Sequence, residues 1–159
     1  MNKLELKQLI LTSLSEKLAI ARSSTQRAID AATDEETVPE HKYDTLALEA
    51  SYLAHGQAMR VQESESEIQQ FESLVLRELP DEKVALGSYV TLLCEDDSVK
   101  HLFVGPCSGG VTVNYLGESV SVITLQAPLG RVLLGREEGD EVELKIADSV
   151  YYYEISKIK

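Results

Sequence analysis

Apolar side chains in the first half of the chain recur at alternating steps of three and four residues. A first stripe consists of Leu11, Leu14, Leu18, Ala21, Thr25, Ala28 and Ala32. A second stripe consists of Tyr43, Ala47, Ala50, Ala54, Gln57, Val61, Ser64, Ile68, Phe71 and Val75. This is the heptad spacing of a coiled coil, so the pattern predicts two long helices that pack along these stripes.

The side-chain sizes in the two stripes run in opposite directions. The first stripe begins with leucines and ends with alanines, whereas the second begins with alanines and ends with larger side chains. Antiparallel helices would place small residues opposite small ones and large residues opposite large ones. We therefore expect residues 1–78 to form an antiparallel coiled-coil hairpin, with arms of about 30 residues and about 45 Å. Thr37 and Glu40 fit a capping box at the start of the second arm, where Pro39 is tolerated.

From residue 79 onward the pattern changes to short runs rich in Val, Leu, Thr and Tyr. Acidic and glycine-rich turns separate them, such as Glu95-Asp96-Asp97 and Ser108-Gly109-Gly110. The expected strands are residues 89–94, 99–105, 111–115, 120–125, 141–147 and 150–158. Residues 127–135 predict one short helix, because Pro128 suits a helix start and Gly135 a helix end. The fold class is therefore α+β, with the hairpin in residues 1–78 and an antiparallel β domain with one short helix in residues 79–159.

Composition and charge narrow the classes of partner. The chain of 159 residues is 43% hydrophobic and carries a net charge of −12. Phosphate backbones repel such a chain, so we expect no direct nucleic-acid binding. No apolar run reaches the roughly 18 residues of a membrane span, and the N-terminus lacks the regions of a signal peptide. We expect a cytoplasmic monomer that does not bind membranes.

Acidic residues gather between the two predicted helices. Residues 33–44 contain one basic residue, Lys42, and five acidic residues: Asp34, Glu35, Glu36, Glu40 and Asp44. Taken alone, such a cluster is either a solvated turn or a functional tip.

The remaining candidate groups for chemistry are few. Cys94, His101 and Cys107 do not match a common zinc spacing, so we expect the cysteines to be reduced, partly buried thiols. His41 and His55 are expected at the surface. No catalytic order of Ser, His and Asp and no phosphate-binding loop is visible. We therefore expect no enzyme activity of the chain's own.

The segment from Ala127 to Val142 carries a family resemblance. It reads APLGRVLLGREEGDEV and resembles the C-terminal signature of the Gre family of bacterial transcription elongation factors. The signature comprises a Ser/Ala-Pro helix, a Leu-x-Gly-(Lys/Arg) exit and a Gly-Asp turn. The resemblance implies an FKBP-like fold for residues 79–159. It also implies that this domain docks on RNA polymerase, through Pro128, Leu129 and Arg131.

The same resemblance implies what the hairpin does. In Gre factors the hairpin enters the polymerase secondary channel, and acids at its tip help to cleave backtracked RNA. The corresponding tip acids are Asp34, Glu35, Glu36 and Glu40. Glu36 and Glu40 would help to hold a Mg²⁺ ion shared with the polymerase, and the chain alone would bind no cofactor.

Alternatives remain open at the tip. The family motif there is approximately Asp-Leu-x-Glu-Asn-x-Glu-Tyr, whereas this chain reads DEETVPEHKY from Asp34 to Tyr43. If Tyr43 matches the motif tyrosine, neither Glu36 nor Glu40 falls in register, and Pro39 replaces a helix-compatible residue. A polymerase-binding regulator without cleavage activity is therefore a second hypothesis. A chaperone-like or adaptor protein with a gripping hairpin is a third.

Overall fold

The computed structural model describes residues 1–33, 46–76 and 82–159. The chain divides into two compact units, one formed by Thr12–Gln69 and the other by Met1–Leu11 together with Gln70–Lys159. Two long helices, α1 (Lys3–Thr33) and α2 (Leu46–Glu72), contribute residues to both units. The domain boundary expected at residues 78–79 lies outside the described residues and stays a prediction. Across the described residues, no helix has the length and apolar character to cross a membrane.

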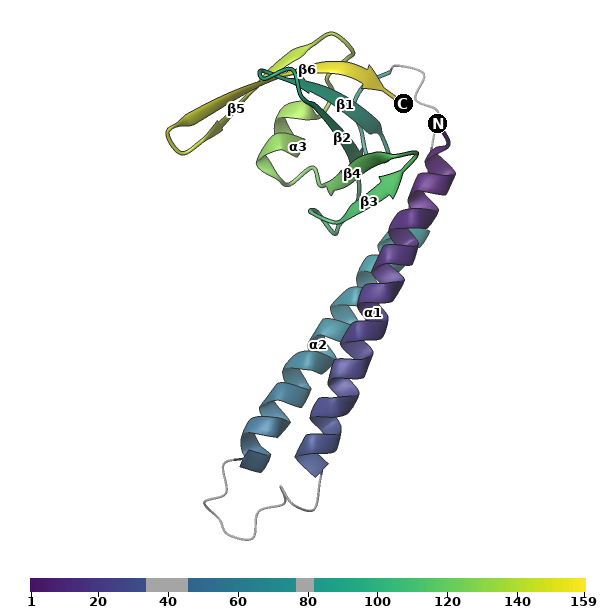
Figure 1. The fold of residues 1–159 in the computed structure, drawn as a ribbon, viewed down its shortest axis with the longest axis vertical. Helices are drawn as coiled ribbons and strands as arrows, with labels where there is room; N and C mark the ends of the chain where they lie inside the picture. The colour runs from purple at the N-terminus through teal and green to yellow at the C-terminus, as the bar shows by residue number, and fades with distance from the viewer. Residues whose placement is uncertain (34–45, 77–81) are drawn as a thin grey trace. The chain divides into compact units, whose positions relative to one another are not determined.

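The helical unit is an antiparallel pair. Lys17 Nζ lies 3.6 Å from Glu67 Oε2, and Arg22 Nη2 lies 3.2 Å from Glu65 Oε1. As the residue number rises along α1, the number of its partner on α2 falls, so the two helices run in opposite directions (Figure 1).

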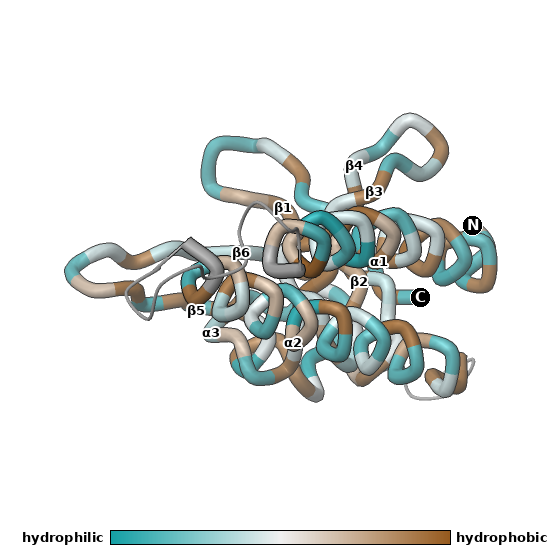
Figure 2. The backbone as a smooth tube through the Cα atoms, turned by 90° about the horizontal axis from the view of Figure 1, so that it is seen from below, coloured by the Kyte–Doolittle hydropathy of each residue, from teal (hydrophilic) through white to brown (hydrophobic). Residues whose placement is uncertain are grey.

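Burial follows the predicted stripes. On α1 the inward positions are Leu11, Leu14, Leu18, Ala21, Thr25 and Ala28, and on α2 they are Ala50, Ala54, Gln57, Val61, Ser64, Ile68 and Phe71. Figure 2 shows the corresponding alternation of hydrophobic and hydrophilic positions along both helices. The expectation for Val75 was wrong, because α2 ends at Glu72 and Val75 is 65% exposed. Leu74, 8% exposed, is buried after the helix end instead.

The second unit contains a six-stranded sheet with one short helix. The strands are β1 (Tyr89–Cys94), β2 (Val99–Val104), β3 (Thr112–Tyr115), β4 (Glu118–Ile123), β5 (Glu141–Ile146) and β6 (Ser149–Ile158). The helix is α3 (Pro128–Leu133), and the strand order is β3-β4-β2-β1-β6-β5. The expected α+β class, with two long helices followed by a sheet and a short helix, is confirmed.

One pairing differs from the expected antiparallel sheet. Strands β2 and β4 are parallel, while the other four neighbouring pairs are antiparallel. After β2 the chain crosses to the edge of the sheet, forms β3 there, and returns as β4 between β3 and β2. Apolar alternation reveals where strands are but not which strands become neighbours, so the sequence could not show this insertion.

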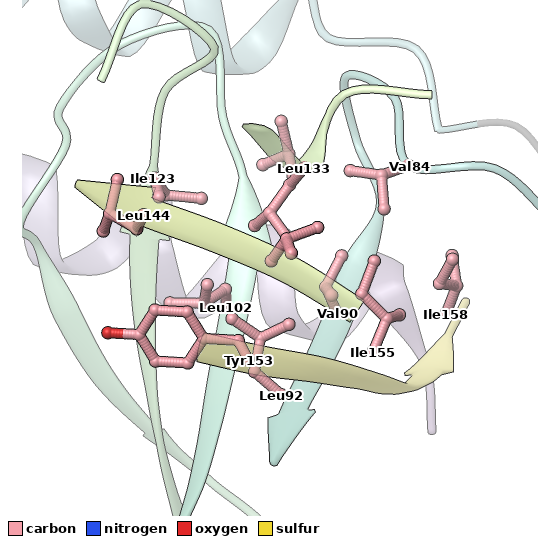
Figure 3. Close-up of a cluster of buried hydrophobic side chains, with 12 residues drawn as sticks. Val84, Val90, Leu92, Leu102, Ile123, Leu133, Leu144, Tyr153, Ile155 and Ile158 are labelled. Carbon is pink, nitrogen blue, oxygen red and sulfur yellow. The ribbon is translucent and has the colours of Figure 1, made fainter. Parts of the chain in front are cut away.

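The two faces of the sheet are covered differently. On one face, Leu133 of α3 packs with Val90, Leu92 and Ile155, all fully buried (Figure 3). On the other, Phe103 of β2 stacks with Phe71 at the end of α2, with ring centroids 6.5 Å apart. The helix ends at residues 1–11 and 70–72 thus belong to the same compact unit as the sheet.

Candidate functional site

The family-like segment begins with α3, whose start fits its sequence. Ala127 has extended backbone angles (φ −67°, ψ 150°) and makes no side-chain cap to the helix. Pro128 follows at the first helical turn, where its missing N–H removes a donor that would lack a partner. The backbone N–H of Arg131 donates to Ala127 O at 2.9 Å, which closes the first turn. Ala127 has no hydroxyl group, so it cannot cap the helix as serine or threonine would.

Gly130 lets α3 lie directly on the main chain that follows β4. A Cβ atom placed on Gly130 would lie 1.9 Å from the carbonyl oxygen of Thr124 and 2.8 Å from its carbonyl carbon. Both atoms belong to the backbone, so no side-chain movement could relieve the clash. Only glycine is therefore compatible with this helix position.

The exit of α3 is attached to the segment before β1. Gly135 has a left-handed φ of +77°, and its N–H donates to Val84 O at 2.8 Å. The N–H of Val84 in turn donates to Arg136 O at 2.8 Å. Val84 is 1% exposed and belongs to the core beneath the helix. The Leu-x-Gly-Arg exit thus fixes the end of α3 to the segment around Val84.

The Gly-Asp turn joins the helix exit to β6. The N–H of Gly139 donates to Ile155 O at 2.7 Å, and Asp140 Oδ2 accepts the N–H of Glu137 at 2.9 Å. Glu138 Oε1 accepts the N–H of Ile158, also at 2.9 Å. Two of the acids in this segment are therefore backbone caps, and the segment is recognisable because the fold constrains its residues.

The outward side of α3 is exposed to solvent. Pro128 and Arg131 are exposed, and Leu134 just after the helix is 52% exposed. Leu129 is half-buried and packs against the core cluster. The structure thus brings the predicted docking residues Pro128, Leu129 and Arg131 onto one short helix. Leu129 also contributes to the stability of the domain.

The predicted tip acids Asp34, Glu35, Glu36 and Glu40 lie outside the described residues, as does the metal assignment to Glu36 and Glu40. In the described part of the chain, no group of three or more His, Cys, Asp or Glu side chains could hold a metal ion. Cys94 and Cys107 are half-buried, as expected from the sequence, and Ser108 Oγ donates a hydrogen bond to Cys107 Sγ at 3.5 Å.

The sequence analysis missed a polar cluster formed by Tyr89, His101 and Glu118. The hydroxyl of Tyr89 lies 2.7 Å from His101 Nδ1, and His101 Nε2 lies 3.2 Å from Glu118 Oε2. Burial raises the pKa of the Tyr89 hydroxyl, and the nearby Glu118 carboxylate adds to the rise. The cluster links β1, β2 and β4. The alternation of side chains along the strands could have indicated this cluster, because Tyr89 and His101 occupy sheet positions that point to the same side as Phe103.

Tyr115 extends this polar arrangement to the first turn of α1. Its hydroxyl donates to Glu5 Oε2 at 3.1 Å and accepts the backbone N–H of Asn2 at 2.9 Å. Met1, Tyr89, His101 and Tyr115 all line one pocket of about 280 Å³. These contacts lie within one compact unit and attach the start of α1 to the sheet.

Comparison with known proteins decides the family. The sequence profile described as "Transcription elongation factor, GreA/GreB, C-term" matches residues 79–159, about half of the chain. The chain belongs to the GreA/GreB family. The resemblance drawn from residues 127–142 is therefore confirmed, and the profile describes a family of transcription elongation factors.

Individual GreA proteins are similar over different lengths. The transcription elongation factor GreA of Zymomonas mobilis is 40% identical over 82 residues, which cover 51% of this chain and 48% of that protein. GreA of Bartonella tribocorum is 28% identical over 121 residues, covering 72% and 73% of the two chains. In the first of these matches, the chain spans about half the length of its relative.

Solved structures of related factors align with the chain at low TM-scores. Gfh1 of Thermus thermophilus, a GreA factor homolog, is 20% identical, covers 94% of both chains and gives a TM-score of 0.40. The GreA/GreB factor of Nitrosomonas europaea is 26% identical, covers 62% of this chain and 78% of its own, and gives a TM-score of 0.38.

Proposed function

We propose that this protein regulates transcription elongation in the cytoplasm by binding RNA polymerase at its secondary channel. The observation that carries the proposal is the GreA/GreB match over residues 79–159, joined in the same chain to an antiparallel pair of long helices. The polymerase carries out the chemistry, and the protein acts as an accessory factor.

Docking is assigned to the outward side of α3. Pro128 and Arg131 are exposed there, while Gly130 and Leu133 hold the helix on the sheet. A short helix fixed from below presents its outer side chains with little conformational freedom, which lowers the entropy cost of binding. Arg131 can make paired hydrogen bonds with a carboxylate of the polymerase.

The acids between the helices are assigned to RNA cleavage. Mg²⁺ in a protein site takes one or two carboxylates and completes its shell with water and phosphate oxygens. Glu36 and Glu40 would supply such carboxylates to an ion shared with the polymerase, and Asp34 and Glu35 would add negative charge beside it. A second metal ion stabilises the attacking and leaving oxygens of phosphodiester cleavage.

The sequence of the tip favours a second candidate, occupation of the channel without cleavage. Pro39 and the shifted register of Glu36 and Glu40 depart from the family motif. In this alternative the same docking blocks access to the channel and inhibits cleavage by other factors.

A cleavage assay on a backtracked polymerase complex separates the two. The full chain should bind core polymerase and accelerate RNA cleavage, and Glu36→Ala with Glu40→Ala should abolish the acceleration while binding persists. Arg131→Ala should weaken binding itself. Glu49→Ala with Glu63→Ala is the matched control, because both acids are exposed on α2.

Each other outcome has a defined meaning. Slower cleavage on adding the unaltered protein would support channel occupation and remove the cleavage role. Failure to bind polymerase at all would reject both candidates and favour the adaptor hypothesis.

A further inference from the structure

A groove at the far end of the sheet takes no part in the site described above. Strand β5 pairs with residues 149–154 of β6, whereas β1 pairs with β6 only from Tyr153 onward. Residues 149–152 therefore continue beyond β1 as part of a two-stranded ribbon, which is visible in Figure 1. The ribbon and the β1–β2 turn enclose a pocket of about 330 Å³, lined by Glu95, Lys100 and Tyr151–Tyr153 among others.

Three consecutive tyrosines give this groove its aromatic lining. Tyr153 is buried, but Tyr151 is 43% exposed and Tyr152 is 50% exposed. Successive side chains of a strand point to opposite faces, so Tyr151 and Tyr152 present rings on both sides of the ribbon. Tyr152 also lines a second pocket of about 200 Å³. Tyrosine is enriched in protein–protein interfaces relative to the rest of a protein surface.

One of these rings already receives a cation from within the chain. Lys100 Nζ lies 5.2 Å from the centroid of the Tyr153 ring, within the range of a cation–π contact. The described residues supply no such cation to Tyr151 or Tyr152. The same chemistry is therefore available to an external cation at the two exposed rings.

Carboxylates line the second pocket beside Tyr152. Glu141 lies directly opposite Glu154 across β5 and β6, an arrangement of like charges that destabilises a strand pair. Glu95 joins them around the second pocket. Within the described ranges, none of these carboxylates forms an ion pair with Lys or Arg. A cation bound there would offset a repulsion that the folded chain carries.

We propose that the second pocket, which is lined by Glu95, Glu141, Tyr152 and Glu154 and which we call the tyrosine groove, binds an extended arginine-bearing segment of a partner protein. A guanidinium group stacks on an aromatic ring and bonds a carboxylate through two parallel N–H groups. A lysine ammonium makes neither contact as well. The groove excludes nucleic acid by its charge. It is separate from the docking residues of α3 and does not depend on the function proposed above.

The test is a titration of the isotope-labelled full chain with two synthetic peptides, followed by two-dimensional amide NMR. One peptide alternates arginine with glycine and serine, and the other carries lysine at the same positions. We expect shifts concentrated at the tyrosine groove, and tighter binding of the arginine peptide by about fivefold, the scale of one cation–π contact.

Matched variants decide whether the groove is responsible. Tyr152→Ala should weaken arginine-peptide binding by about fivefold, and Glu141→Gln with Glu154→Gln should weaken it to a similar degree. The controls are Tyr52→Ala, a tyrosine 70% exposed on α2, and Glu49→Gln with Glu63→Gln, which remove the same charge elsewhere. Amide spectra of every variant verify that the fold persists.

Three results would overturn the proposal. These are equal binding of the two peptides, shifts spread over all acidic surfaces, or equal losses in groove and control variants. Each would reduce the effect to the general attraction of a chain of charge −12 for basic peptides.

Discussion

The sheet unit and the helical unit meet different physical requirements. The sheet unit depends on individual backbone positions: Gly130 admits no side chain, and Gly135 and Gly139 have left-handed φ angles. The helical unit depends on a repeat, in which many apolar residues of suitable size can occupy each inward position. A fold that constrains single residues leaves a recognisable signature, whereas a repeat does not. This explains why the family resemblance is concentrated in residues 127–142.

The two units also differ in their cores. Fully buried side chains of the sheet unit include Phe103, Leu92, Leu133 and Ile155. In the helical unit the buried residues among those described are Leu14, Leu18, Ala28 and Ser64. Two helices alone bury only one stripe each, so this unit removes less apolar surface from water and gains less stability from it.

The largest expected effect comes from the same substitution made in each unit. Gly130→Ala should destabilise the sheet unit by about 4 kcal/mol or more, because its Cβ would meet the Thr124 carbonyl. Gly56→Ala in α2 should stabilise the helical unit by about 0.5–1 kcal/mol, because nothing lies within 4 Å of the added Cβ. Urea unfolding of each variant, followed by circular dichroism, measures both. If both substitutions changed the free energy of unfolding by a similar amount in the same direction, the contrast between the two units would be contradicted.

The next effect concerns Phe71, which is fully buried and stacks with Phe103. Phe71→Ala should cost about 3–5 kcal/mol through lost burial and a cavity. Phe71→Leu is the control and should cost less, because it retains most of the apolar volume. Thermal unfolding monitored by the tyrosine signal reports on the sheet. A loss below about 1 kcal/mol would show that the end of α2 contributes little to this unit.

A smaller effect is expected at Tyr89. Tyr89→Phe removes the hydroxyl that lies 2.7 Å from His101 Nδ1, and should cost about 1 kcal/mol at neutral pH. The difference should shrink as pH rises above 10. Because its pKa is raised, the Tyr89 hydroxyl stays neutral in the folded protein at a pH at which it already ionises in the unfolded chain. Ionisation of Tyr89 in the unfolded state therefore lowers the stability of the parent protein at high pH, and the variant, which lacks this hydroxyl, does not lose that stability. Denaturation at pH 7 and pH 10.5 tests the sign, which a difference that grows with pH would contradict.

The smallest effect tests the antiparallel register of the helices. Arg22 and Glu65 are 61% and 49% exposed, so their ion pair should contribute about 0.2–1 kcal/mol. A double-mutant cycle with Arg22→Ala and Glu65→Ala measures the coupling free energy, and 1 M salt should reduce it. Arg22→Ala paired with Glu63→Ala is the control and should show no coupling. Equal coupling in both cycles would contradict the register.

Much of the helical pair was predictable because burial follows a period. Leu14, Leu18, Ala28 and Ser64 are buried where the heptad spacing places them. The exception is Val75, where the pattern continued past the end of α2. Strand positions were predictable for a similar reason, since alternation marks a half-buried strand.

The candidate site was less predictable than the fold. The sequence placed Pro128, Leu129 and Arg131 on one helix. It did not show that Leu129 also packs against the hydrophobic core. The Tyr89–His101–Glu118 cluster joins residues from three strands, and the like-charge pair Glu141/Glu154 depends on strand register. Neither arrangement exists until the strands pair.

By itself, the sequence determined the two helical stripes, the positions of the strands and the family signature, because these depend on the order of residues within short segments. Tertiary structure alone decided the parallel insertion of β4 beside β2, the contact of Phe71 with Phe103 and the convergence of Tyr152 with Glu95. Those features join residues distant in the chain, and side chains acquire such neighbours only when the backbone hydrogen bonds of the sheet fix which strands lie together.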